Sequence, residues 1–218
     1  MIADARTADA LMAALAAGGG VLLTATEAKK LEAAMFGSGK LSADFIAQSA
    51  GSVARRAGLT RAEVLAAHFL IVEETGVGAG HPFSGEKLSP VLAFYRTPDF
   101  DRAVALAGSI LRYQGAGHSI GLHSASRDRA LHLGLKLPVC RVIVNQAHCF
   151  ATGGSFDNAL PFSLSMGCGT WGRNSISDNL NYKHFLNITR IVHPIAAEHV
   201  RESTVDELFG DYRRKYGA

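Results

Sequence analysis

The strongest constraint on the fold is the regular alternation of apolar and amphipathic segments between residues 91 and 145. Short apolar runs, typical of buried strands, alternate with segments whose apolar residues recur at helical spacing. The expected strands are 91–95, 119–123 and 139–145, and the expected helices are 98–113 and 126–136. Strands joined by helices over short connections predict an α/β fold, in which a mainly parallel sheet carries helices on both faces.

The first 80 residues continue this pattern and contain clear start and stop signals. Three consecutive glycines end the first expected helix. Thr24 and Glu27 have the spacing of a capping box, which predicts that a helix begins there, and Ser42 is a candidate cap for another. Helices are therefore expected over 4–17 and 24–36, and strands over 21–23 and 69–73.

The last third of the chain has a different character. Residues 149–179 are rich in glycine and contain several aromatic residues. Ordered loops of this length in α/β domains are usually functional or lie against another chain. Residues 187–194 are expected to form one extended strand and 198–216 a terminal helix. We therefore expect a main domain over 1–186 and an arm over 187–218 that joins copies of the chain in a homo-oligomer.

Composition excludes several functional classes. The 218 residues are 48% hydrophobic and carry a net charge of +3, with no cluster of cations long enough for a nucleic-acid footprint. No apolar run approaches the roughly 20 residues of a membrane span, and charged residues interrupt the Ala-rich N-terminus. The odd number of cysteines favours reduced thiols. We therefore expect a cytoplasmic protein that binds neither nucleic acid nor membrane.

Two polar residues are candidates for a site. Glu86 lies between two prolines, directly before an expected strand, where its carboxylate could bind a sugar diol or could be solvated and paired with Lys87. His118 follows Gly115-Ala116-Gly117 at a junction of helix and strand. Its imidazole could act as an acid or base near neutral pH, or could be structural. These glycines follow a helix and precede a strand, the reverse of a dinucleotide-binding loop.

The cysteines give weaker signals. The spacing of Cys140, His148, Cys149 and Cys168 matches no zinc pattern, so no metal is expected. Cys140 and Cys168 are expected to be small buried residues, whereas Cys149 could be an exposed thiol. If the chain is extended at 148–149, these two side chains point to opposite faces and need not touch.

Several motifs together resemble one family. They are PFSGEKLSPVLAFYR at 82–96, GAGHSI at 115–120, RVIVN at 141–145 and SLSMGCGTWGRNSISDNLNYKHFLNITR at 163–190. These resemble the CoA-acylating aldehyde dehydrogenases, including the aldehyde dehydrogenase half of the bifunctional alcohol/aldehyde dehydrogenases. Weaker similarity continues through 9–80. The stretch from Cys149 to Gly172 most resembles the sulfoacetaldehyde and succinate-semialdehyde branch.

The resemblance implies an oxidoreductase mechanism in two steps. A cysteine thiolate attacks the aldehyde, hydride passes to NAD or NADP, and CoA then takes the acyl group from the thioester. Glu86 matches the family glutamate that holds the ribose on the nicotinamide side, with Phe83 beside it in the same cofactor-binding motif. His118 matches a histidine near the reacting centre and is expected to support catalysis. Arg173 is the cation nominated to bind an anionic substrate.

One departure from the family limits these expectations. The matching segments place the nucleophilic cysteine just before Met1, so Cys140, Cys149 and Cys168 do not inherit its role, and the glycine-rich cofactor domain has no counterpart here. We expect the chain to be an N-terminally truncated catalytic domain that is inactive alone. The alternative is a noncatalytic folding or assembly module with the same fold. A thiol enzyme that uses Cys149 with His118 or His148 is the least favoured hypothesis.

Overall fold

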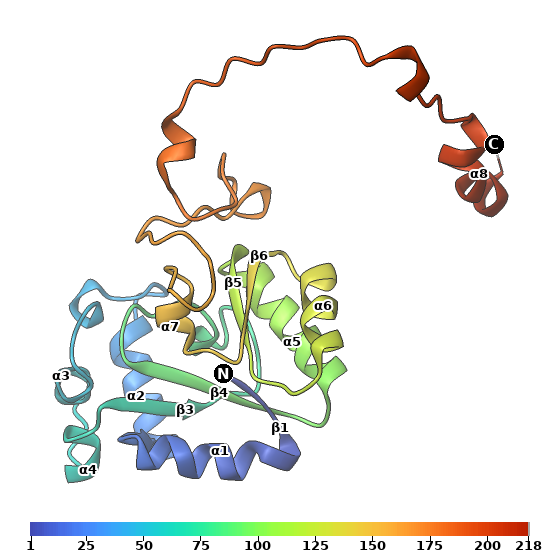
Figure 1. Ribbon diagram of the computed structural model, residues 1–218. Coiled ribbons are helices and arrows are strands. Elements are labelled where there is room, and N and C mark those ends of the chain that lie inside the picture. The colour runs from blue at the N-terminus through green and yellow to red at the C-terminus, as the bar shows by residue number, and fades with distance from the viewer. Residues whose placement is uncertain (218) are drawn as a thin grey trace. The chain divides into compact units, whose positions relative to one another are not determined.

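The computed structural model describes residues 1–217 and divides into two compact units, residues 1–181 and the segment that begins at Tyr182 (Figure 1). The strands are β1 (Ile2–Asp4), β2 (Gly20–Leu22), β3 (Phe69–Glu73), β4 (Val91–Thr97), β5 (Gly117–Leu122) and β6 (Val139–Val144). The α-helices are α1 (Ala5–Ala17), α2 (Ala25–Phe36), α3 (Ala50–Arg56), α4 (Ala62–Leu65), α5 (Phe100–Tyr113), α6 (Arg127–Lys136), α7 (His148–Ala151) and α8 (Val205–Tyr216). Short 3-10 helices form at Ala43–Phe45, Pro82–Ser84, Thr170–Gly172, Tyr182–Phe185 and Ala197–His199.

All strand pairs in the first unit are parallel, which confirms the predicted α/β class. Four strands form a sheet in the order β1-β4-β3-β2, and β5 and β6 pair separately as a two-stranded sheet. The strands therefore belong to two sheets, where the sequence predicted one. The short strand β1 was also missed, because its three residues precede α1 directly and resemble the first turn of that helix.

Helices cover both faces of the four-stranded sheet. In β3, Leu70 and Val72 point into a core formed with α2, α3 and α4. Ile71 lies between them in sequence and faces the opposite side, where it packs with Phe94 against α1. This alternation is the period of two expected for a strand that is buried on both faces. The prediction of helices on both faces is confirmed.

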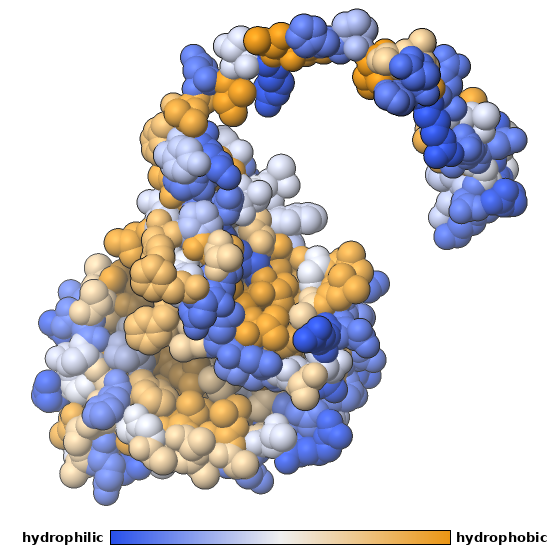
Figure 2. All heavy atoms as spheres, in the orientation of Figure 1, coloured by the Kyte–Doolittle hydropathy of each residue, from blue (hydrophilic) through white to orange (hydrophobic). Residues whose placement is uncertain are grey.

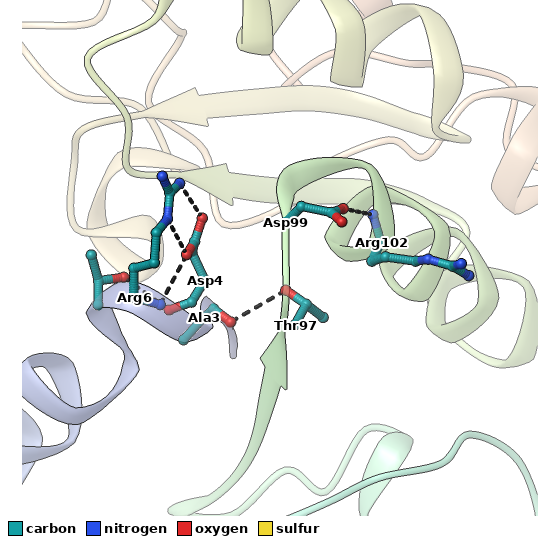
Figure 3. Close-up of polar contacts among 7 residues, drawn as sticks. Ala3, Asp4, Arg6, Thr97, Asp99 and Arg102 are labelled. Atoms are coloured by element: carbon teal, nitrogen blue, oxygen red, sulfur yellow. Dashed lines mark hydrogen bonds and ion pairs between the residues drawn. The ribbon is translucent and has the colours of Figure 1, made fainter.

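Helix caps fix the points at which the chain enters α1 and α5 (Figure 3). Asp4 accepts a hydrogen bond from the backbone nitrogen of Arg6 at 3.0 Å, and Asp99 accepts one from that of Arg102 at 2.8 Å. Between these two caps, the Thr97 hydroxyl donates to the Ala3 backbone oxygen at 3.2 Å. The edge strand β1 is thereby held to β4 by a side chain as well as by backbone pairing.

The capping box predicted at Thr24 and Glu27 is present at the start of α2. The Glu27 carboxylate also pairs with the guanidinium of Arg61, at 2.9 Å from Nη2. The helix predicted after Ser42 is shorter than expected. Ser42 caps only the 3-10 turn Ala43–Phe45, and the next α-helix begins at Ala50.

The second unit differs from its prediction in two ways. Residues 187–194 form no strand, because no described residue pairs with them through a backbone ladder. The terminal helix begins at Val205 and not at 198, because Thr204 and Glu207 form a capping box that sets its first turn. Figure 2 shows apolar side chains interspersed with polar ones along this segment. The exposed apolar residues of 187–195 are Ile188, Ile191, Val192 and Ile195.

Among the described residues, no helix has both the length and the apolar character needed to cross a membrane.

Candidate functional site

The loop between β3 and β4 carries Glu86 and Phe83, and the structure gives these residues different environments. Phe83 is only 2% exposed and packs edge-on against Phe36, with the ring centres 5.5 Å apart. Glu86 is exposed. The expected alternative, an ion pair with Lys87, is absent among the described residues, because the Lys87 ammonium instead donates to the Phe83 and Gly85 backbone oxygens at 2.6 and 2.8 Å. The loop is therefore fixed internally, which leaves the Glu86 carboxylate available.

Burial lowers the pKa of Lys87 to about 8, while the carboxylates of Glu74 and Glu86 act in the opposite direction. Glu74 follows the carboxyl end of β3 and accepts hydrogen bonds from the backbone nitrogens of Thr75 and Gly76. Its carboxylate also lies 2.7 Å from Nδ1 of His81. A partly buried carboxylate, a histidine and a lysine with a lowered pKa are thus gathered at this end of the sheet, where α/β folds commonly bind ligands.

A hollow of about 490 Å³ opens beside this loop. Glu86 and Gln114 both line it, and Lys29 and Lys40 contribute cations. The Glu86 backbone nitrogen donates to the Gln114 side-chain oxygen at 2.8 Å. Gln114 immediately precedes Gly115-Ala116-Gly117-His118, so this bond joins the two segments that the sequence marked as functional.

His118 belongs to a second polar cluster at the start of β5. Its Nδ1 lies 2.7 Å from the hydroxyl oxygen of Ser119, and the same oxygen lies 2.7 Å from Nε2 of His148. The Thr152 hydroxyl donates to Ser119 at 3.4 Å. His118 is exposed, whereas His148 is partly buried. Burial, followed by the proximity of His118, lowers the pKa of His148.

The glycines before His118 serve packing. Gly117 has a φ of 93°, and a Cβ atom there would lie 2.3 Å from the Cys168 backbone oxygen. Glycine therefore permits β5 to approach the glycine-rich loop closely. Because Gly115 follows α5 and Gly117 opens β5, these glycines also have the order that excludes a dinucleotide-binding loop.

The environments of the thiols correct one expectation. Cys149 is exposed, which agrees with the interpretation of Cys149 as an exposed thiol. His148 and Cys149, however, lie in the helical turn α7 and not in an extended segment. Cys140 and Cys168 are partly buried, and burial raises the pKa of the Cys140 thiol. No group of three or more potential metal ligands is found among the described residues.

A buried arginine holds the glycine-rich loop in place. Arg141 is 6% exposed, and its Nε donates to the Asn179 side-chain oxygen at 2.9 Å. Its Nη1 donates to the Gly167 backbone oxygen at 3.1 Å, while Nη2 is buried without a hydrogen-bond partner. Asn179 also donates to the backbone oxygens of Thr152 and Pro161. The loop that the sequence marked as functional is thus anchored to β6 through Gly167 and Asn179, and Asn179 in turn holds Thr152 and Pro161.

Arg173 lies in the same loop and is exposed. Its backbone is left-handed, with a φ of 59°, and its side chain forms no ion pair with the described residues. No hydrogen bond joins Arg173 to His118 or Glu86 within residues 1–217.

Sequence reasoning missed Gln114, Ser119, Arg141 and Asn179, and it considered His148 only as a neighbour of Cys149. Gln114 directly precedes the motif GAGHSI and Ser119 lies within it, so their position was a usable signal. Arg141 and Asn179 are 38 residues apart, and nothing in the local sequence relates them.

Comparison with known proteins gives a consistent result. No family model matches the chain. The acylating sulfoacetaldehyde dehydrogenase of Cupriavidus necator is 58% identical over 95% of this chain and 41% of that protein. The acetylating succinate-semialdehyde dehydrogenase of Clostridium kluyveri is 35% identical over 88% of this chain and 42% of that protein. The chain thus spans about two fifths of the length of these curated relatives.

Solved structures agree. An acetylating aldehyde dehydrogenase from Geobacillus thermoglucosidasius matches 93% of this chain and 43% of its own, with a TM-score of 0.82 and 31% identity. A probable aldehyde dehydrogenase from Listeria monocytogenes matches 92% of this chain and 44% of its own, with a TM-score of 0.83 and 33% identity. Sequence and fold give the same assignment: the chain belongs to the acylating aldehyde dehydrogenase family and corresponds to a segment of those enzymes.

Proposed function

We propose that this chain is part of an oxidoreductase that converts a small aldehyde, NAD(P) and CoA to an acyl-CoA and NAD(P)H. The observation that carries the proposal is the 58% identity to an acylating sulfoacetaldehyde dehydrogenase across nearly the whole chain. The site is compatible with it, since an exposed carboxylate lines a hollow and a histidine cluster begins on β5, the next strand along the chain.

The residues of the hollow fit a nicotinamide cofactor. Glu86 presents two carboxylate oxygens that can each accept a hydrogen bond from a ribose hydroxyl. Lys29 and Lys40 line the same hollow together with Glu32, so cations and carboxylates both face it. Phe83 contributes indirectly, because its buried ring packs against Phe36 and anchors the loop that carries Glu86. When bound, the cofactor supplies the hydride acceptor.

His118 is proposed to hold and move a proton near the reacting centre. Its exposure leaves it accessible to a substrate, while Ser119 fixes the position of one ring nitrogen. An imidazole titrates near neutral pH, so it can serve as an acid or a base.

The nucleophilic cysteine is proposed to lie outside these 218 residues. Cys140 is partly buried and its pKa is raised by burial, the opposite of an activated thiol. Cys149 is exposed but forms no hydrogen bond to a histidine among the described residues. We therefore propose that the polypeptide is inactive alone. A noncatalytic folding or assembly module remains the alternative function.

An anionic aldehyde is the proposed substrate. The name of the Cupriavidus relative specifies sulfoacetaldehyde, and that of the Clostridium relative specifies succinate semialdehyde. Both aldehydes carry a negative group. The guanidinium of Arg173 is exposed and forms no ion pair with residues 1–217, so it is suited to bind a sulfonate or carboxylate.

A second copy of the chain is the proposed partner of residues 187–194. Ile191 and Val192 are adjacent and are 83% and 85% exposed, so both faces of an extended segment would be apolar. An unpaired segment of this kind is suited to add to a sheet edge of another protomer.

The proposed function is tested with the enzyme that contains this chain. Sulfoacetaldehyde, succinate semialdehyde and acetaldehyde are compared as substrates, with NAD or NADP and with or without CoA. The expected result is CoA-dependent reduction of the cofactor, with the highest kcat/KM for an anionic aldehyde. Absence of acyl-CoA formation with all three aldehydes would refute the proposed reaction. Arg173→Ala is expected to lower kcat/KM for the anionic aldehydes and to leave that for acetaldehyde unchanged.

A further inference from the structure

The hydroxyl group of Ser119 connects two imidazoles. Its oxygen lies 2.7 Å from Nδ1 of His118 and 2.7 Å from Nε2 of His148, and His148 is 29 residues away in sequence. Both distances are those of good hydrogen bonds. The three side chains therefore form a continuous chain of hydrogen bonds that runs from the exposed His118 to the partly buried His148.

A serine hydroxyl has a single proton, so the chain has a direction. Ser119 can donate to only one of the two imidazoles and must accept from the other. Burial lowers the pKa of His148, which favours its neutral form and leaves a nitrogen able to accept. In one of the two possible arrangements, Ser119 donates to Nε2 of His148 and accepts from Nδ1 of His118. Nε2 of His118 is left unprotonated.

Other groups lie close to these three side chains. The Thr152 hydroxyl is within hydrogen-bond distance of both the Ser119 oxygen, at 3.4 Å, and the Met166 sulfur, at 3.5 Å. On β6, the Arg141 guanidinium donates to the His118 backbone oxygen at 3.5 Å. Beneath His148 lies Gly121, where a Cβ atom would be 3.3 Å from Nδ1 of the ring. No carboxylate lies within ion-pair distance of either imidazole among residues 1–217.

We propose that Ser119 and His148 position His118 and form a proton relay with it, in which His148 is the terminal acceptor. The relay rests on the proposed function in one respect only, the identity of the reacting group that exchanges a proton with His118. When Nε2 of His118 takes a proton from a reacting group, its Nδ1 proton passes to the Ser119 oxygen. The Ser119 proton passes in turn to Nε2 of His148. One proton enters and one positive charge forms on His148. Because burial disfavours the charged form of His148, this charge is transient, the proton returns along the same hydrogen bonds, and no other reactant is needed.

The arrangement of protons is tested without any substrate. The 218-residue chain, labelled with ¹⁵N in histidine, is studied by NMR spectra that correlate ring nitrogens with ring protons. We expect His118 to be the tautomer protonated at Nδ1 and His148 to carry an unprotonated Nε2. His123, exposed just beyond β5, is the internal reference for a free imidazole. If His118 shows the same tautomer mixture as His123, or is protonated at Nε2, the relay is refuted.

Variants test the role of the relay in the reaction. In the enzyme containing this chain, Ser119→Ala is expected to lower kcat by about tenfold, at the modest end of acid–base effects, with KM for the aldehyde unchanged. Ser119→Thr keeps a hydroxyl and is expected to restore most of the activity. His148→Gln is expected to change the acidic limb of the pH–kcat profile, whereas the control His123→Gln is expected to leave it unchanged.

The two proposals fail in different ways. An unchanged kcat in Ser119→Ala, or a pH profile unaffected by His148→Gln, would overturn the relay and leave the proposed reaction intact. If Ser119→Ala does not fold, the tautomer of His118 in the unsubstituted chain and the activity of Ser119→Thr still decide the question. An enzyme that forms no acyl-CoA, yet shows the expected tautomers, would count against the proposed reaction alone.

Discussion

The backbone nitrogen of Glu86 donates a hydrogen bond to the side-chain oxygen of Gln114 at a distance of 2.8 Å. The two residues are 28 positions apart and line the same hollow. Glu86 is the proposed ribose ligand, and Gln114 ends α5 just before the segment that leads to His118. The orientation of the Glu86 loop therefore depends on a side chain that takes no part in the proposed chemistry.

Replacing Gln114 with alanine is expected to raise KM for the nicotinamide cofactor. Loss of one neutral hydrogen bond costs about 1 kcal/mol, which corresponds to roughly a fivefold change. Steady-state kinetics of the enzyme that contains this chain measure the effect, with kcat expected to change little. Glu86→Gln should raise KM more than Gln114→Ala does. Equal KM values for Gln114→Ala and the unsubstituted enzyme would show that this bond does not position the cofactor site.

Substitution of Asn179 by alanine is expected to lower the free energy of unfolding by about 3 kcal/mol, because it leaves the buried Arg141 guanidinium with fewer partners. Denaturant unfolding measures the loss. Hydrogen exchange should accelerate in residues 152–167, which Asn179 and Arg141 hold through backbone oxygens. Ser175→Ala, at an exposed position in the same loop, serves as the control and should stay within about 0.5 kcal/mol of the original stability. If Asn179→Ala lowered the free energy of unfolding by less than about 0.5 kcal/mol, the anchoring role of Asn179 would be contradicted.

Acidification is expected to weaken the attachment of α2 to the segment that carries Arg61. Pairing with Arg61 lowers the pKa of Glu27 from 4.5 to about 2. Because the folded-state pKa is the lower one, this contribution is fully present above about pH 4.5 and is lost as the pH falls toward 2. The side chains are 15% and 36% exposed, so screening limits the effect to about 1 kcal/mol.

Unfolding measured between pH 2 and pH 6 tests this expectation. Glu27→Gln should reduce the pH dependence. Glu32→Gln, at an exposed glutamate of the same helix that forms no ion pair among the described residues, should preserve it. If Glu27→Gln and Glu32→Gln showed the same pH dependence of the free energy of unfolding, a stabilising ion pair between Glu27 and Arg61 would be contradicted.

The three thiols are expected to react at different rates. Cys149 is exposed and should be alkylated first by iodoacetamide, whereas partial burial and a raised pKa should make Cys140 slow. Peptide mass spectrometry after timed labelling gives the order. Faster labelling of Cys140 than of Cys149 would contradict the packing of β6 described above.

The sequence predicted most of the local structure, because the signals were local. The capping box at Thr24 and the apolar run of β3 each lie within a few residues, and both elements form where expected. The separate pairing of β5 with β6 depends on contacts between distant residues, and no local pattern encodes it. Residues 187–194 form no strand among the described residues for a related reason, since a strand requires a partner that local sequence does not reveal.

The candidate site was also predictable only in part: its motif residues could be identified from the sequence, and the residues that support them could not. Glu86 and His118 belong to recognisable motifs, and the structure places both at exposed positions. The contacts that orient them come from Gln114, Ser119 and His148. Such supporting residues have no motif of their own, because their role depends on which segments the fold brings together.

The central claim is that this chain supports a cysteine-thioester reaction whose nucleophile lies outside its 218 residues. The most direct test is to incubate the enzyme that contains the chain with aldehyde and NAD(P) without CoA, and then to locate the acyl group by peptide mass spectrometry. The account predicts a single acylated cysteine outside these residues, with Cys140, Cys149 and Cys168 unmodified. An acyl group on any one of those three would contradict it.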